Sequence, residues 1–269
     1  MPEIDNYQVY NDRMRRSMWD KAFFMDKVPG TELILDYGCA DGSLIRFLSE
    51  IFPAMHFIGF DIDPVMVEKA NADRRENTRF YSTMPELLEG IRESGIPGEQ
   101  ITIYFSSVFH EVFHYGFDLS MLKELIRRIS PQYLVVRDMM YQSGTDEAMV
   151  SAEAEERVRE SIPAAQIRDF EEIWGSIRLR RQMVHLLLKY HYTENWPREC
   201  AENYFSYTDR ELMEVLDPDG CYRRIFYSRY ILPWIRYDVE QNLGIDLGED
   251  FTTHYTLILS RKTLRRILL

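Results

Sequence analysis

The hydrophobic positions of the chain follow two periods in turn, and their alternation predicts a sheet covered by helices. Short apolar runs typical of buried strands lie at residues 32–38, 55–61, 79–83, 101–108 and 133–140. Between the runs, apolar residues recur at helical spacing. One such segment ends before Pro53, and another begins with Asp63 as cap and Pro64 in its first turn. This order is typical of an α/β protein with a doubly wound, mostly parallel sheet.

Two later segments extend the pattern. The β-rich runs at 223–232 and 253–261, separated by a polar loop containing Gly244 and Gly248, are expected to pair as an antiparallel C-terminal edge. Residues 141–205 are longer than a normal crossover and carry apolar residues at helical spacing. We therefore expect a single domain, 1–269, with a helical insertion at 141–205 that acts as a lid or substrate region. Residues 1–32 are expected to form an N-terminal helical extension.

Composition narrows the class of protein. The chain is 45% hydrophobic, which supports a real core, and its three cysteines are too far apart for a disulfide framework or a zinc site. No apolar run approaches the roughly 20 residues needed to span a bilayer, so we expect a cytoplasmic protein without membrane contact. The net charge of -12 repels phosphate backbones over most of the surface.

The turn after the first predicted strand carries the candidate ligand-binding residues. Residues 35–42, LDYGCADG, join a strand to a helix, where small residues let a ligand lie against the backbone. A dinucleotide-binding loop would have glycine at position 43, but Ser43 stands there and Gly42 comes one place earlier. The spacing favours another nucleotide, and it disfavours a nicotinamide dehydrogenase.

Asp36, Gly38 and Gly42 match the first motif of class I methyltransferases, an acidic residue followed by alternating glycines, while Ala40 departs from it. Over residues 33–138 the chain thus resembles the class I, Rossmann-like, S-adenosylmethionine-dependent methyltransferases. The resemblance implies a Rossmann-like fold and S-adenosylmethionine as cofactor. It also implies that Asp36 lies near the amino group of the donor and that the backbone from Gly38 through Cys39 and Ala40 to Gly42 holds its methionine portion.

Further cofactor contacts are expected at the ends of the next strands. Strand two ends at Asp61, where a carboxylate can accept hydrogen bonds from both ribose hydroxyls. Asp63 is explained instead as a helix cap before Pro64. The resemblance places the residue flanking the adenine near Ser82, Thr83 or Met84, and we add Thr83, Ile62 and Ser106 to the expected cofactor site.

Strand four is followed by the candidate catalytic residues His110 and Glu111. Because ligands bind at the carboxyl edge of such sheets, the methyl acceptor is expected here, with His110 either as a general base or as a structural hydrogen-bonding group. Residues 110–114 also match the HExxH pattern of zinc proteases. The pattern follows a buried strand and has no suitably spaced third ligand downstream, so we expect no metal.

Residues 173–196 combine basic and aromatic side chains. Arg178, Arg180, Arg181 and Lys189 are followed by aromatic residues, which can hold nucleic acid by phosphate contacts and stacking. A lid helix with one solvated basic face is the favoured interpretation, and the candidate walls of an acceptor pocket are Trp174, His185, Tyr190, Trp196 and Tyr204.

The function expected from these features is S-adenosylmethionine-dependent methyl transfer to a small-molecule acceptor. Two alternatives stay open. The enzyme could methylate RNA or a nucleotide through the basic aromatic strip, or the chain could bind S-adenosylmethionine without catalysis. The sequence leaves the oligomeric state undetermined.

Overall fold

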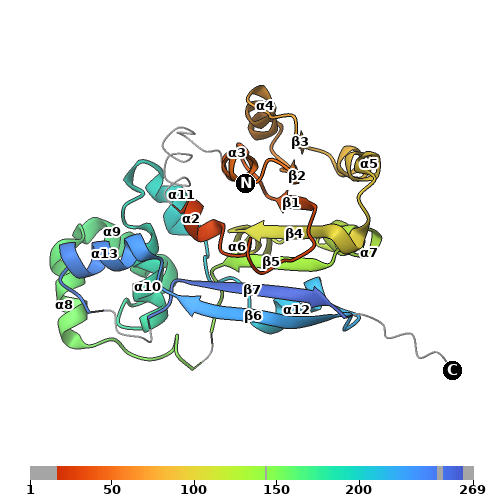
Figure 1. Cartoon of the computed structure of the whole chain (residues 1–269). Coiled ribbons are helices and arrows are strands. Elements are labelled where there is room, and N and C mark those ends of the chain that lie inside the picture. The colour runs from red at the N-terminus through yellow and green to blue at the C-terminus, as the bar shows by residue number, and fades with distance from the viewer. Residues whose placement is uncertain (1–16, 143, 247–250, 263–269) are drawn as a thin grey trace.

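The computed structural model describes residues 17–142, 144–246 and 251–262. Its centre is a seven-stranded sheet of order β3-β2-β1-β4-β5-β7-β6 (Figure 1). The strands are β1 (Leu33–Tyr37), β2 (His56–Phe60), β3 (Thr78–Tyr81), β4 (Ile101–Ser106), β5 (Tyr133–Asp138), β6 (Tyr222–Tyr230) and β7 (His254–Arg261). The first five are parallel, and β7 pairs antiparallel with both β5 and β6, which confirms the predicted doubly wound, Rossmann-like sheet and its antiparallel edge.

Alternate residues of each buried strand point to opposite faces, and a different set of helices covers each face. Ile34 packs with residues of α3 (Ser43–Ile51) and α4 (Pro64–Ala72). Leu33 and Leu35 belong to a second apolar cluster with α5 (Met84–Ser94), α7 (Ser120–Ile129) and α12 (Asp209–Leu216). The near-continuous burial of β1, β4 and β5 follows from this two-sided cover.

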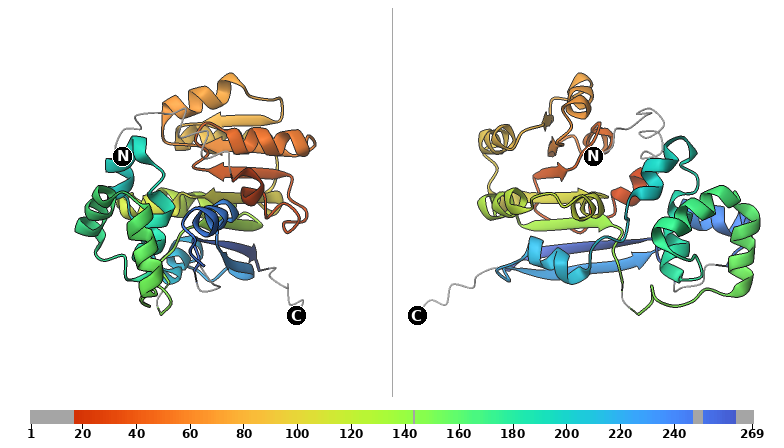
Figure 2. Two further views of the ribbon diagram at one scale, coloured as in Figure 1. Left: turned by 90° about the vertical axis from the view of Figure 1, so that its left-hand side faces the viewer. Right: turned by 180° about the vertical axis from the view of Figure 1, so that it is seen from behind.

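A helical lobe lies beyond the carboxyl ends of the parallel strands (Figures 1 and 2). It has its own apolar core, in which Val158, Phe170 and Leu187 are buried together. Its helices are α8 (Ala152–Ser161), α9 (Ala164–Trp174), α10 (Arg180–Lys189), α11 (Trp196–Ala201) and α13 (Pro233–Asn242). Four of them come from the segment between β5 and β6, so that segment is helical as predicted.

One prediction about this region is wrong. The sequence predicts a polar loop between the last two strands, β6 and β7. The structure has the ten-residue helix α13 there, with Pro233 in its first turn. Ile235 and Val239, one helical turn apart, are buried against the lobe. The tertiary contact therefore selects a helix where the local polarity indicated a loop.

The shorter elements are α2 (Met18–Lys21), α6 (Phe109–His114), η1 (Gly98–Gln100) and η2 (Thr193–Asn195). Residues 1–16, half of the expected N-terminal extension, lie outside the described residues, as do 143, 247–250 and 263–269. None of the helices in the described part of the chain has both the length and the apolar composition that crossing a bilayer requires.

Candidate active site

The turn between β1 and α3 depends on residues in the left-handed region of backbone space. Gly38 has φ 86°, Gly42 has φ 72° and Ala40 has φ 45°. A Cβ added at Gly38 would lie 2.1 Å from Cγ2 of Val108, so only glycine fits between the turn and the end of β4. The N–H groups of Gly38 and Cys39 both donate to the carbonyl oxygen of Phe60, at 2.7 and 3.0 Å, which fixes the turn against β2.

Asp61 follows β2 and is bonded to the same turn. Its Oδ2 accepts a hydrogen bond from the N–H of Ala40 at 2.8 Å, and its Oδ1 accepts one from the N–H of Asp63 at 3.0 Å. Burial raises the pKa of the Asp61 carboxyl, although these backbone bonds act in the opposite sense. Asp63 caps α4 by accepting from the N–H of Val65, which confirms the explanation given for it from the sequence.

A cavity of about 300 Å³ opens at the carboxyl ends of β1, β2 and β4, where the strand order changes direction. Gly38, Asp61 and Ile62 line it, as the sequence predicts for a cofactor site. Ser82 and Met84 line it too, whereas the predicted Thr83 is exposed and caps α5. We call this space the donor cavity.

Asp36 is buried near the end of β1, and Oδ1 of its carboxyl group accepts no hydrogen bond from the described residues. Burial raises the pKa of Asp36 to about 7, and the nearby Lys21 ammonium acts against this rise. A buried oxygen without a donor is costly, so its position indicates a ligand that brings a donor to it.

Other predicted cofactor residues lie in or close to the turn without lining the donor cavity: Asp36, Cys39, Ala40, Gly42 and Ser106. Cys39 is buried in the apolar cluster beneath α3. Ser106 ends β4 and is buried, and its hydroxyl is a second polar group without a hydrogen-bond partner among the described residues. The next residue, Ser107, faces a different cavity.

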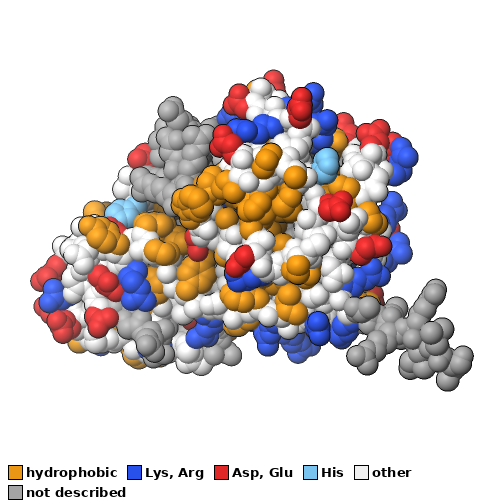
Figure 3. All heavy atoms as spheres, viewed as in Figure 1, with side chains coloured by type: hydrophobic (Ala, Val, Ile, Leu, Met, Phe, Trp, Pro, Cys, Tyr) orange, Lys and Arg blue, Asp and Glu red, His pale blue; other side chains and the backbone are white. Residues whose placement is uncertain are grey.

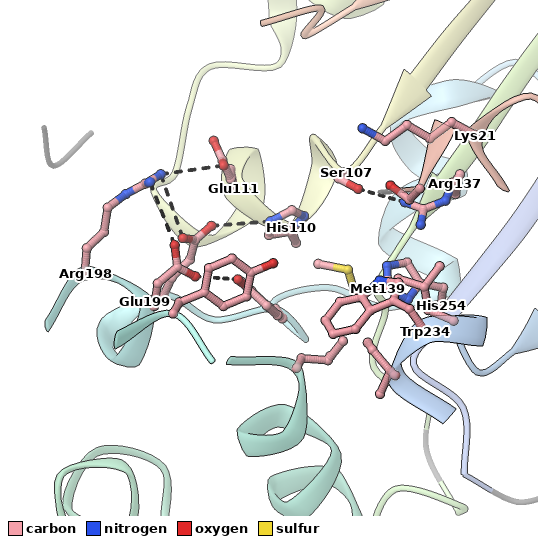
Figure 4. A pocket seen from close by; sticks show the side chains of 17 residues that line it. Lys21, Ser107, His110, Glu111, Arg137, Met139, Arg198, Glu199, Trp234 and His254 are labelled. Carbon is pink, nitrogen blue, oxygen red and sulfur yellow. Dashed lines mark hydrogen bonds and ion pairs between the residues drawn. The ribbon is translucent and has the colours of Figure 1, made fainter. Parts of the chain in front are cut away.

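This second cavity, about 100 Å³, lies between the sheet and the helical lobe (Figure 4). Charged side chains surround it from several elements: Lys21 from α2, Arg137 from β5, and Arg198, Glu199 and Glu202 from α11 and the residue after it. We call it the polar cavity. Apolar groups, among them Met139 and Trp234, complete its wall.

His110 projects into the polar cavity (Figure 4), and a carboxylate faces each of its ring nitrogens. Nδ1 lies 2.7 Å from Oδ1 of Asp138, and Nε2 lies 3.3 Å from Oε1 of Glu202. Asp138 also accepts from the N–H groups of Phe109 and Met139, at 2.7 and 2.8 Å, which fixes the position of its carboxyl group. Burial favours the neutral ring, but these two carboxylates raise the pKa of His110 well above its usual value.

Glu111, the neighbour of His110 on α6, lines both cavities. It lies at the point where the two spaces adjoin. Burial and the charge of Glu202 raise the pKa of Glu111 to about 7, and its closest cation is Arg198, 3.8 Å from its Oε1. The two residues predicted to be catalytic are therefore brought to one wall, and Glu111 is the one that faces the donor cavity.

Several residues of the polar cavity carried no signal in the sequence. Lys21, Arg198 and Glu202 are ordinary charged residues of helical segments, and only the fold brings them to His110. Among the five predicted pocket walls, Tyr204 lines the cavity. The others do not; Trp174 and His185, for example, pack against each other at 5.0 Å between ring centroids.

The basic aromatic strip is not a continuous surface. Lys189 is fully buried, and its ammonium donates to the backbone carbonyl groups of Glu199, at 2.5 Å, and Glu202. Arg178 pairs with Glu155 at 3.0 Å, and Arg181 lies over the ring of Tyr141. The strip thus offers fewer cations to a phosphate backbone than its sequence indicated.

Comparison with known proteins finds a family match for the segment that contains the donor cavity. Residues 34–132 match the family model described as a methyltransferase domain. A search of curated proteins finds no match. Among solved structures, an S-adenosylmethionine-dependent methyltransferase from Mesorhizobium loti is 15% identical, with 91% of this chain and 98% of that chain covered and a TM-score of 0.52. The plantazolicin methyltransferase BamL, in complex with a triazolic desmethylPZN analog and SAH, is 12% identical, with 94% and 88% covered and a TM-score of 0.50.

At these identities the two structures show a common fold, while the family model covers the strands and turns that build the donor cavity. The family match indicates S-adenosylmethionine as the cofactor. Gly38 and Asp61 line the cavity beside the turn between β1 and α3, and Asp36, whose buried Oδ1 has no hydrogen-bond partner within the described ranges, comes two residues before Gly38. Residues 34–132 are thus similar to the methyltransferase domain family, and the chain shares the Rossmann-like fold of an S-adenosylmethionine-dependent methyltransferase.

Proposed function

We propose that this protein is an enzyme that transfers the methyl group of S-adenosylmethionine to a small polar acceptor in the polar cavity. The observation that carries the proposal is that Glu111 lines both cavities, so a donor and an acceptor bound in them would meet at this residue. Bringing two reactants together in this way supplies much of the rate of a displacement reaction.

On the donor side, Asp61 would accept hydrogen bonds from the ribose hydroxyls with the lone pairs that its two backbone bonds leave available. Asp36 would accept from the amino group through Oδ1. Of the three residues predicted near the adenine, Ser82 and Met84, which line the cavity, would lie beside it, and Thr83 would not. When bound, the donor supplies a methyl group already activated by its sulfonium, so alignment is the main task left to the protein.

On the acceptor side, the small volume and the charged lining favour a compact polar molecule over a polymer. Both ring nitrogens of His110 already face a carboxylate, so neither is available to remove a proton from an acceptor. His110 therefore orients its neighbours in this proposal and does not act as a general base. In this proposal the whole chain is one methyltransferase domain, and residues 141–205 form the lid and substrate region.

Donor binding tests the first half of the proposal. Titration calorimetry with S-adenosylhomocysteine should show affinity weakened by about 1–3 kcal/mol in Asp61→Asn, because one carboxylate acceptor is lost. Asp63→Asn is the matched control: it changes the same chemical group two residues away, where Asp63 caps α4 instead of lining the cavity. Equal affinity in wild type and Asp61→Asn would refute the assigned role.

Transfer of a labelled methyl group tests the second half. The enzyme and labelled donor are incubated separately with the small-molecule fraction and the RNA fraction of a cell extract. We expect label in the small-molecule fraction. Label in RNA alone would favour RNA or nucleotide methylation, and donor binding without transfer to either fraction would favour a non-catalytic binding module.

A further inference from the structure

Three metal-ligating side chains meet in the wall of the polar cavity. His110, Glu111 and Glu202 each offer one ligand atom, and these atoms all lie within 4.8 Å of one another. Nε2 of His110 and Oε1 of Glu202 are 3.3 Å apart. Metal–ligand bonds of about 2.0–2.2 Å place neighbouring ligand atoms roughly 3 Å apart, so this pair already has a suitable spacing.

The histidine is oriented as a ligand would be. Asp138 faces Nδ1 at 2.7 Å and is itself fixed by backbone N–H groups, so Nδ1 carries the proton and Nε2 points to Glu111 and Glu202. A carboxylate behind the second ring nitrogen is the usual support of a metal-binding histidine.

One ligand atom is also left without a hydrogen bond. Glu202 is 2% exposed, and its Oε1, which faces Nε2 of His110 at 3.3 Å, accepts no hydrogen bond of good geometry from the described residues. The other oxygen, Oε2, is 3.9 Å from Arg198. A buried carboxylate oxygen in this state is expensive unless a cation binds it.

The charge around the cluster leads to the same conclusion. Four carboxylates contribute negative charge, those of Asp138, Glu111, Glu199 and Glu202. Arg198 lies 3.8 Å from Glu111, and Lys189 contacts the backbone beside Glu199 and Glu202, while Lys21 and Arg137 line another part of the same cavity. A divalent cation among these carboxylates would add positive charge where they are most crowded.

We propose that His110, Glu111 and Glu202 bind a divalent metal ion. One imidazole nitrogen and two carboxylates suit Mn²⁺ or Zn²⁺. The three ligands lie on one wall, so the open coordination positions face the polar cavity. An acceptor with a hydroxyl or carboxylate oxygen can occupy them, and this use of the metal rests on the proposed function.

The site differs from the one that the HExxH pattern indicates. In that pattern the second histidine, His114, is a ligand, but His114 ends α6 outside the cluster and its ring packs against Tyr115. Glu202, from the residue just after α11, takes its place. The two arrangements make opposite predictions for His114.

Calorimetric titration of the ligand-free, chelator-treated protein with MnCl₂ and with ZnCl₂ tests the proposal. We expect one site in wild type, affinity reduced at least tenfold in His110→Gln and in Glu202→Gln, and a change of less than threefold in His114→Gln. The magnetic resonance spectrum of bound Mn²⁺ should show coupling to a single imidazole nitrogen. This signature needs no variant, so it decides the question even if a substitution prevents folding.

No saturable binding in wild type at millimolar metal would overturn the proposal, as would a loss in His114→Gln equal to that in His110→Gln. S-adenosylhomocysteine binding is measured on the same samples. A protein that binds this compound but no metal keeps its proposed function and loses the metal site. A protein that binds metal but not this compound gives the reverse result.

Discussion

Gly38 is the residue at which the structure makes its most quantitative prediction. In Gly38→Ala the new Cβ meets Cγ2 of Val108 at 2.1 Å, and the residue must keep φ near 86°. The left-handed backbone costs roughly 1–2 kcal/mol for a residue with a side chain, and overpacking costs about 1–3 kcal/mol. Because alanine also loses less entropy than glycine on folding, by about 0.5–1 kcal/mol, we expect a net loss of about 2–4 kcal/mol.

The two contributions can be separated by urea unfolding of four variants. Gly95→Ala measures the backbone cost alone, since Gly95 has φ 68° and nothing within 4 Å of an added Cβ. Val108→Ala removes the clashing methyl, so adding Gly38→Ala to it should cost only about as much as Gly95→Ala. A coupling energy of about 1–3 kcal/mol between positions 38 and 108 follows. Strictly additive losses would refute the steric argument.

Three further predictions concern the turn after β1 and the core of the helical lobe. Ala40 has φ 45°, so Ala40→Gly should raise the free energy of unfolding by about 0.5–1 kcal/mol in urea; a loss would show that the turn does not strain alanine. Burial raises the pKa of Asp36 from 3.8 to about 7, so the folded state holds the proton of this carboxyl more tightly than the unfolded state does. Relative to Asp36→Asn, the free energy of unfolding of the ligand-free protein should therefore fall as pH rises from about 4 to about 7, by up to about 1.4 kcal/mol per pH unit. A difference between the two proteins that does not change with pH would contradict this. Lys189→Met removes the ammonium that donates to two buried carbonyl groups, so it should lower the free energy of unfolding in urea by about 2–4 kcal/mol. The exposed control Lys123→Met should change it very little, and similar values for both variants would show that the buried ammonium is dispensable.

Most of the fold follows from local pattern. β1, β4 and β5 are buried on both faces, so their apolar runs stand out in the sequence, and the turn from Asp36 to Gly42 has a glycine spacing similar to that of one ligand-binding motif. The sequence pattern does not predict helix α13, because few of its residues are apolar at helical spacing. Only Ile235 and Val239 are buried within it, and packing against the lobe selects the helix.

The two cavities differ in how far they could be predicted. Gly38 and Asp61 lie near strand ends of one sheet edge, so topology alone brings them together. The polar cavity depends on Glu202 meeting His110, and no sequence spacing encodes that contact because it is set by how the lobe packs on the sheet. Thr83 is predicted from the sequence to lie beside the adenine, but its hydroxyl accepts a hydrogen bond from the N–H of Glu86 and caps α5. Its neighbours Ser82 and Met84 line the cavity instead.

The origin of the cavity walls has an evolutionary consequence. The donor cavity is built by residues 37–122, within the segment that matches the methyltransferase family model, whereas Arg198, Glu199, Glu202 and Tyr204 come from the stretch between β5 and β6. Under the proposed function, exchange of that stretch would change which compound is methylated, while the segment that builds the donor cavity stays the same.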